Sequence, residues 1–214
     1  MGRGVVGQGV SDVEWTDKEF VGEDFSNREL TGIRLIRCRF VGCSFKRAEL
    51  SEAVTAGSVY DSCDFTDARM GASEHKKSAF LHGRFENTGL FSVRFEECKM
   101  TGSVFASASL RHSVIRGGDW SFVVLRGLDL SGMDWSEVCL KEADLGECRL
   151  DGANLRRSDL TRAVLQNASL KSADLRGTTL SEAILTDAVF RGARMGIEQA
   201  VAVAASLGAL VEWQ

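Results

Sequence analysis

Residues 143–177 read ADLGE CRLDG ANLRR SDLTR AVLQN ASLKS ADLRG, which is seven consecutive groups of five with a Leu at each centre. Two positions before each Leu the residue is Ala, Cys or Ser, and the remaining positions are mostly polar or charged. Neither an α-helix, with a period of 3.6, nor a strand, with a period of 2, produces a repeat of five. The stretch therefore predicts a solenoid built from five-residue units.

The same pattern covers most of the chain. The central position of each unit falls on a multiple of five, and 34 of the 36 central positions from Phe20 to Met195 hold a large apolar residue. Thr55 and His75 are the exceptions. We call the residue two places before each central position the small position. Of the 32 small positions from 38 to 193, only those of Leu128 and Met133 hold a residue larger than Val. One large and one small residue per unit therefore point inward, and the unbroken register predicts no inserted loop.

A second period shows how the units stack. Phe recurs every twenty residues along one column of central positions, from Phe25 to Phe105, whereas the neighbouring column from Leu30 holds no Phe before Phe190. Four units therefore make one coil, and like residues lie above like residues. We number the four faces by their central positions: face 1 on 15, 35 and 55, face 2 on 20, 40 and 60, face 3 on 25, 45 and 65, and face 4 on 30, 50 and 70, each continuing in steps of twenty.

Repeats of the form A(N/D)LXX in four-sided coils resemble those of the pentapeptide repeat proteins. The resemblance covers about residues 13–195 and implies an all-β fold, a right-handed quadrilateral β-helix of about nine coils. Within that family, a stand-alone chain of this size is similar to the MfpA and Qnr group, whose members imitate B-form DNA and bind DNA gyrase. The absence of inserted loops makes the chain more similar to the MfpA type than to the Qnr type.

The two ends and one internal stretch depart from the repeat. We expect an N-terminal tail over 1–12, the β-helix over 13–195, and a capping helix with a tail over 196–214, with the helix itself from about 197 to 207. Lys18, Glu23, Arg28 and Ile33 occupy early small positions and predict distorted first coils or a cap. Trp120 and Trp135, together with the large residues at two small positions, predict a wider or bent cross-section between 118 and 138.

The C-terminal segment is more apolar than one coil end requires. An open solenoid end must be covered, which a cap alone would achieve. The resemblance to the MfpA and Qnr group implies a homodimer formed tail to tail through the same segment. The residues predicted to serve the cap and the dimer interface are Ile197, Val201, Ala204, Leu207, Leu210, Val211 and Trp213.

Composition excludes several classes of function. The formal net charge of −4 disfavours direct binding of nucleic acid. No stretch approaches the roughly 18 apolar residues of a membrane span, so we expect a cytoplasmic protein that contacts no membrane. Five of the six cysteines occupy small positions and should be buried free thiols, leaving Cys139 as the accessible one. Zinc-ligand spacing is absent, and neither a metal nor another cofactor is expected.

Catalysis is also disfavoured. His75 lies at a central position with Thr55 twenty residues before it, which predicts a local irregularity, and His82 and His112 lie outside on different sides. Carboxylates on a convex rod do not converge with a base in a cleft, as general acid-base catalysis requires. We therefore expect no enzyme, and the unbroken register also argues against the loop-borne active site of a β-helix enzyme.

Charge is distributed unevenly over the four faces. Face 3 carries seven acids against four bases and face 2 six against four, so together they sum to −5, whereas face 1 has eight acids and ten bases. We call faces 2 and 3 the acidic side. An acidic side on a straight rod presents carboxylates to a basic groove much as a duplex presents phosphates. The predicted partner-binding residues are Asp24, Asp61, Asp64, Asp67, Glu86, Asp119, Glu142, Asp144, Glu147, Asp159, Glu182 and Asp187.

Two hypotheses for function follow. The resemblance implies a DNA-mimicking protein that binds DNA gyrase or topoisomerase IV, inhibits or protects the enzyme, and so confers resistance to quinolones or to another gyrase poison. The alternative is a structural or scaffolding module for a different protein partner. Reversal of the charges on the acidic side separates them, because only the first hypothesis needs these carboxylates.

Overall fold

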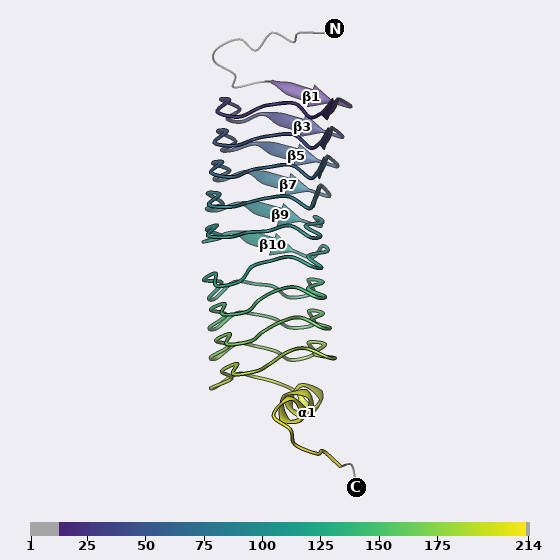
Figure 1. Cartoon of the computed structure of the whole chain (residues 1–214), viewed down its shortest axis with the longest axis vertical. Coiled ribbons are helices and arrows are strands. Elements are labelled where there is room, and N and C mark those ends of the chain that lie inside the picture. The colour runs from purple at the N-terminus through teal and green to yellow at the C-terminus, as the bar shows by residue number, and fades with distance from the viewer. Residues whose placement is uncertain (1–12, 213–214) are drawn as a thin grey trace.

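The computed structural model describes residues 13–212, and within them the chain forms a continuous rod that ends in one helix (Figure 1). Each strand is three residues long because the chain turns a corner every five residues. The strands and the helix are β1 Glu14–Thr16, β2 Glu19–Val21, β3 Arg34–Ile36, β4 Arg39–Val41, β5 Val54–Ala56, β6 Val59–Asp61, β7 Glu74–Lys76, β8 Ala79–Leu81, β9 Arg94–Glu96, β10 Val114–Arg116 and α1 Ile197–Ser206.

All pairing is parallel and joins residues twenty apart, which confirms the four-unit coil. Face 1 forms a six-stranded sheet in the order β1-β3-β5-β7-β9-β10, and face 2 a four-stranded sheet in the order β2-β4-β6-β8. Faces 3 and 4, and the C-terminal half of faces 1 and 2, are joined by isolated bridges, the last of which pairs Asp174 with Arg194. The expectation of about nine coils is slightly off. Strands of a regular sheet span about five turns of the solenoid, from β1 to β10, and the later turns are joined by isolated bridges.

The residue two places after each central position forms the corner. These corner residues have positive φ, for example Asn27 at 58° and Ser62 at 56°. At many of the corners a hydrogen bond then closes the turn, as between the amide N–H of Ala48 and the carbonyl of Phe45 at 3.0 Å. Gly, Asn and small polar residues tolerate this conformation best, which explains their frequency at the corners.

Stacked side chains fill the rod. Consecutive rings from Phe25 to Phe105 on face 3 lie 4.6 to 5.0 Å apart and nearly parallel. A second stack runs along face 2 from Phe20 through Tyr60 to Phe80. The spacing of the rings equals the spacing of parallel strands, about 4.8 Å, so each coil presents its ring directly to the next.

Residues at the small positions lie between neighbouring coils. The Ser103 hydroxyl donates to the carbonyl of Phe80 at 2.8 Å, and the Cys148 thiol to the carbonyl of Leu125 at 2.9 Å. Each of these acceptors lies 23 residues earlier, at a central position of the preceding coil. The side chain at a small position therefore points toward the preceding coil, and its size limits how closely the two coils approach.

This geometry corrects the prediction of distorted first coils. β1 and β2 pair regularly with β3 and β4, although Lys18, Glu23 and Arg28 occupy small positions. No earlier repeat unit within residues 13–212 lies above them, so their long side chains extend from the end of the rod and are exposed. Ile33 is the one large residue of this group that is buried.

The irregularity predicted near Trp120 is confirmed as a seam between segments 105–117 and 125–137. On face 4 no bridge joins Ser109 to Asp129, and on face 1 none joins Val114 to Asp134, although bridges continue on either side. On faces 2 and 3 the same coils stay bonded, as shown by the amide of Phe105, which donates to the carbonyl of Val124 at 2.9 Å.

Leu128 and Met133 account for the seam. By the geometry of the other small positions they point at the carbonyls of Phe105 and Leu110, and both are buried. A side chain of this size does not fit between coils spaced for Ala or Ser, so the ladder opens on these two faces. Coils that separate on two adjoining faces and stay bonded on the other two tilt toward the bonded faces. The acidic side therefore lies on the inner side of the bend.

Thr55 and His75 cause no backbone irregularity, contrary to the prediction. They lie opposite each other in β5 and β7, and the Thr55 hydroxyl lies 2.9 Å from Nδ1 of His75. The Ser73 hydroxyl donates to the carbonyl of Met70 at 2.6 Å and lies 2.9 Å from Nε2 of His75. Burial lowers the pKa of His75 to about 3, so the ring is neutral inside the rod.

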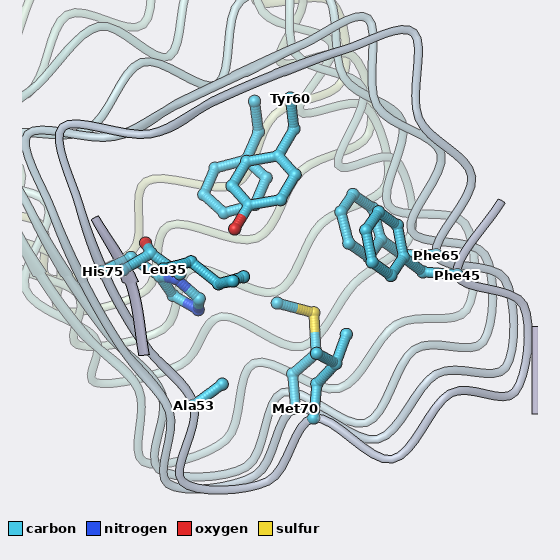
Figure 2. A pocket seen from close by; sticks show the side chains of 10 residues that line it. Leu35, Phe45, Ala53, Tyr60, Phe65, Met70 and His75 are labelled. Carbon is cyan, nitrogen blue, oxygen red and sulfur yellow. The ribbon is translucent and has the colours of Figure 1, made fainter. Parts of the chain in front are cut away.

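Thr55 and His75 line an internal cavity with room for about one water molecule, and Figure 2 shows His75 and Met70 beside it. The Tyr60 hydroxyl points into the cavity, with His75, Leu35 and Met70 around it. Aromatic and aliphatic side chains form most of the lining. The cavity is part of the core and opens no path for a substrate.

The predicted C-terminal helix is confirmed as α1, one residue shorter than expected. The Gln199 side chain accepts from the amide of Gly196 at 3.0 Å and donates to the carbonyl of Thr178 at 2.8 Å. Ala202 and Val203 pack against the end of the core. The helix therefore covers the last coil with Gln199, Ala202 and Val203, none of which the sequence singled out.

Candidate partner-binding surface

The twelve predicted acids all lie on faces 2 and 3, which adjoin along one edge of the rod. They divide into two groups according to their neighbours. Six of them are exposed, namely Asp24, Asp67, Glu86, Glu147, Glu182 and Asp187. The others are half-buried among neighbouring side chains, namely Asp61, Asp64, Asp119, Glu142, Asp144 and Asp159.

Five of these acids form ion pairs with Lys or Arg. Arg126 bonds both Asp144, at 3.0 Å, and Glu147, at 2.8 Å. Lys46 lies 3.2 Å from Asp64 and Lys141 lies 3.3 Å from Asp159, and Arg162 pairs with Glu142. These pairs neutralise much of the charge that the sequence count assigned to the acidic side.

Two of the paired acids have lowered pKa values. Burial opposes the charged form of Asp64, but the amide of Thr66 and the ammonium of Lys46 outweigh it, so the pKa of Asp64 lies below its usual value. Burial likewise opposes ionisation of Asp159, and hydrogen bonds from Thr161 with the charge of Lys141 lower its pKa all the same. Both carboxylates are therefore charged at neutral pH but already engaged.

The other seven acids have no Lys or Arg partner within 4.0 Å among residues 13–212. Asp67 accepts from the Asn87 amide at 2.7 Å, and Asp119 accepts from the Ser121 hydroxyl at 2.6 Å, so neutral donors hold these two. The Ser26 hydroxyl and amide lower the pKa of Asp24. The acids of the acidic side without a Lys or Arg partner, which we call the free acids, are thus Asp24, Asp61, Asp67, Glu86, Asp119, Glu182 and Asp187. Among them, Asp61 accepts from the Ser62 hydroxyl at 3.0 Å and lies 3.7 Å from Nδ1 of His82.

The structure also places apolar residues on the acidic side, which the charge count missed. Val104 and Val124 are bridged neighbours on the outer surface of face 3, and Val164 and Ile184 follow on the same ladder after Asp144. Phe122 lies at the corner where face 2 meets face 3 and is 51% exposed. The sequence could have indicated this apolar surface, because aliphatic residues stand one place before several central positions of face 3.

The arginines of face 1 are largely paired with acids of the same face. Most of the ion pairs in the rod join residues twenty apart, as in Glu14 with Arg34, Asp17 with Arg37, and Glu137 with Arg157. Face 1 is therefore charged but internally compensated, and it offers fewer free charges than its composition suggests.

The predicted cap and dimer residues are distributed unevenly around the C-terminal segment. Val201 and Ala204 are half-buried, whereas Ile197, Leu207 and Leu210 are exposed by 73%, 77% and 94%. Val211 is also exposed, and Trp213 lies outside the described residues. These side chains leave an apolar surface at the end of the rod in addition to the contacts that cap it.

The cysteines do not form a reactive or metal-binding group. Cys38, Cys43, Cys63, Cys98 and Cys148 are buried free thiols, as predicted, and Cys139 is half-buried. Burial raises the pKa of Cys98 to about 11, which keeps it protonated. Among residues 13–212 no group of three or more His, Cys, Asp or Glu side chains is arranged to hold a metal ion. The same residues include no helix with the length and apolar character needed to cross a membrane.

Comparison with known proteins agrees with this architecture. A family model described as Pentapeptide repeats matches the chain in eight copies, with matches over 121–157, 139–177 and 158–196. The chain is 37% identical over 82 residues to the pentapeptide repeat protein MfpA of Mycobacterium tuberculosis. That match covers 38% of this chain and 45% of the relative, less than half of its length.

Solved structures show the same fold. A trypsin-treated variant of QnrB1, a plasmid-mediated fluoroquinolone resistance protein, superposes with a TM-score of 0.59 at 21% identity, covering 94% of this chain and 100% of that chain. Full-length QnrB1 gives a TM-score of 0.58 at 22% identity, with 92% and 100% covered. At these identities the likeness establishes the shared β-solenoid and nothing about partners.

Proposed function

We propose that this chain, which is a pentapeptide repeat protein, is a DNA-mimicking protein that binds DNA gyrase or topoisomerase IV through its acidic side. The observation that carries the proposal is the set of carboxylates on two adjoining faces of a continuous rod for which residues 13–212 supply no Lys or Arg partner. The resemblance of the repeats to the MfpA and Qnr group, together with the 37% identity to MfpA over 82 residues, supports the choice of partner.

Electrostatics supplies the physical reason. A protein surface that binds DNA is lined with Lys and Arg, and complementary charge steers association toward it. A duplex carries one charge per about 1.7 Å of axis, far more than seven free carboxylates provide along this rod. Position and shape must therefore contribute along with charge, and the inner side of the bend is where the free acids lie.

Binding alone would produce the biological effect, and the proposal assigns no catalytic step. A rod that occupies the DNA-binding surface competes with DNA and so inhibits the enzyme. The same competition lowers the amount of cleaved DNA that a quinolone or another gyrase poison can trap, which protects the cell. The proposed partner acts on chromosomal DNA, so the function requires a cytoplasmic location.

A homodimer is part of the proposal. The exposed Ile197, Leu207 and Leu210 form an apolar surface at the C-terminal end, and a second copy placed end to end would cover it. The dimer would double the length of the rod and present two acidic sides to the partner.

Charge reversal at free acids tests the function. We expect Asp67→Lys, Glu86→Lys and Glu182→Lys together to weaken binding to purified DNA gyrase by tenfold or more, because each change replaces attraction by repulsion. The matched control reverses three exposed acids on faces 4 and 1 that likewise have no Lys or Arg partner within 4.0 Å among residues 13–212, namely Glu29, Glu52 and Asp134. Equal loss in both triple variants would contradict a specific acidic side.

The alternative function is a scaffold for another protein. It gains support if wild-type protein fails to bind either topoisomerase, or if the acidic-side triple variant binds as tightly as the wild type. Because all six positions are exposed, neither set of changes should unfold the rod.

A further inference from the structure

Phe122 is an unusual residue for its place in the fold. It occupies a corner position with φ of 60°, where most corners in the rod hold Gly, Asn, Ser or a charged residue. A non-glycine residue pays a conformational cost in this region, and a bulky apolar one gains nothing from exposure to water. Among residues 13–212, Phe122 is the only Phe, Tyr or Trp with positive φ.

Valines extend the apolar surface around Phe122. Val124 follows two residues later and also faces outward, because the intervening Val123 is fully buried. Val104 is bridged to Val124 from the preceding coil and is 37% exposed. At the same corner one coil earlier stands Gly102, where the imidazole ring of His82 occupies the space that a side chain would fill. We name Phe122, Val104 and Val124 the apolar corner.

The apolar corner lies at the inner side of the bend. The seam opens the rod on faces 4 and 1 between segments 105–117 and 125–137, and Phe122 stands where the two bonded faces meet. Along the rod axis the apolar corner therefore lies level with the seam. Across the rod it lies on the side opposite to the seam. A convex partner surface that fits the bend would contact this corner first.

Charge surrounds the apolar corner. Glu142 occupies the same corner position one coil later and is paired with Arg162. Asp119, which has no Lys or Arg partner among residues 13–212, precedes Phe122 by three residues on face 2. Further along face 3 toward the N-terminus lie the free carboxylates of Glu86 and Asp67. The partner that fits this arrangement carries an apolar side chain among Lys and Arg residues.

We propose that the apolar corner is a docking point for an apolar side chain on a basic, DNA-binding protein surface. This inference rests on the proposed function and adds a contact that charge mimicry alone does not require. Proteins that bend DNA commonly insert an apolar wedge between base steps. A rod that replaces DNA on such a protein needs an apolar surface where the wedge would enter, and this chain provides one.

The chain itself supplies a matched control. Phe91 is 56% exposed, slightly more than Phe122, but it lies on face 4, on the outer side of the bend, and packs against the ring of His112 at 5.1 Å. Ser occurs at equivalent positions elsewhere in the rod, at Ser62 and Ser92 for the corner and at Ser51 for the place of Phe91. Phe122→Ser and Phe91→Ser should therefore both fold.

The test is a titration of purified DNA gyrase with wild-type protein and the two variants, at low and at high salt. We expect Phe122→Ser to raise the Kd about tenfold at both salt concentrations, because the lost contact is apolar and salt screens only charge. Phe91→Ser should bind like the wild type. Phe122→Asn, a residue found at other corners, provides a second variant if Phe122→Ser melts earlier than the wild type.

The outcomes separate the two proposals. If the wild type binds and the Phe122 variants bind equally well, or if Phe91→Ser is weakened to the same extent, the docking point is wrong and the proposed function stands. If the wild type does not bind at all, the proposed function fails and the docking point fails with it.

Discussion

The size of a single side chain decides how closely two coils approach. The residue at each small position points at a carbonyl of the preceding coil, as Ser103 does toward Phe80. Ala, Ser, Cys and Thr fit there, and the hydroxyl or thiol groups add a hydrogen bond. Leu128 and Met133 do not fit, and the ladder opens beside them. The sequence predicts that the small positions prefer small residues. It does not predict that the first coil tolerates large residues at these positions.

A large residue introduced at a regular small position should therefore destabilise the rod. Ala163 is fully buried, and we expect Ala163→Leu to lower the free energy of unfolding by about 1–3 kcal/mol through overpacking. Urea denaturation followed by circular dichroism measures the change. As a control, Asn167→Ser at an exposed corner should change stability by less than about 0.5 kcal/mol. Unchanged stability of Ala163→Leu would show that the coils can separate without cost.

His75 should make the stability of the rod depend on pH. Its folded-state pKa of about 3 lies below the unfolded value, so the unfolded chain binds the proton first as the pH falls. The stabilisation is complete above about pH 6.5 and is lost toward pH 3, at up to about 1.4 kcal/mol per pH unit. We expect His75→Phe to remove this contribution to the pH dependence of the free energy of unfolding. Urea denaturation at pH 7 and at pH 4.5 measures the free energy of unfolding of both proteins. If the free energy of unfolding changed equally with pH in the wild type and in His75→Phe, a neutral buried ring would be contradicted.

At the scale of the element, the seam is the one place where the backbone ladder is interrupted within residues 13–195. The amides of Leu110 and His112 have no backbone partner in the next coil, whereas Leu150 donates to the carbonyl of Ser169 at 2.7 Å. The position of the seam follows from Leu128 and Met133, which the sequence identified. Its consequence, a bend toward the acidic side, follows only from knowing which faces stay bonded.

Hydrogen exchange can detect the seam directly. We expect the amides of Leu110 and His112 to exchange at least tenfold faster than those of Leu150 and Gly152, which hold equivalent positions in an intact coil. Nuclear magnetic resonance with residue-level assignment provides the measurement. Equal protection at the two sites would mean that the ladder is closed in solution.

The C-terminal helix caps the rod with one side and exposes another. Leu207 and Leu210 are both exposed, and we expect Leu207→Glu with Leu210→Glu to convert a dimer into a monomer by placing charge in the interface. Sedimentation velocity gives the mass in solution. Val21→Glu, at an exposed site near the opposite end, is the control. A wild-type monomer at micromolar concentration would contradict the dimer.

For the whole molecule, the sequence predicts the rod and its faces but not the charges that remain free. The register alone assigns Asp144 and Glu147 to the acidic side, yet both are bonded to Arg126 from the preceding coil. Side-chain direction and length decide such pairs, so counting charges per face overestimates the acidic surface. Asp67 and Glu86 remain free because no Lys or Arg side chain in the described part of the chain comes within 4.0 Å of them.

The apolar corner shows the same limit of sequence reasoning. Val104 and Val124 are recognisable as outward aliphatic residues, but their significance depends on the bend that brings the inner side of the rod to a partner. Phe122 becomes conspicuous only once its corner conformation and exposure are known. Periodicity therefore predicts what faces outward, and the three-dimensional arrangement is needed to find which outward residues act together.

The measurement that tests the account most directly is DNA supercoiling by purified gyrase with increasing amounts of this protein, with and without a quinolone. Competition for the DNA-binding surface predicts a dose-dependent loss of supercoiled product and less drug-stabilised cleavage. The triple variant at Asp67, Glu86 and Glu182 should lose both effects. Unchanged supercoiling and unchanged cleavage at a molar excess of protein would contradict DNA mimicry toward gyrase.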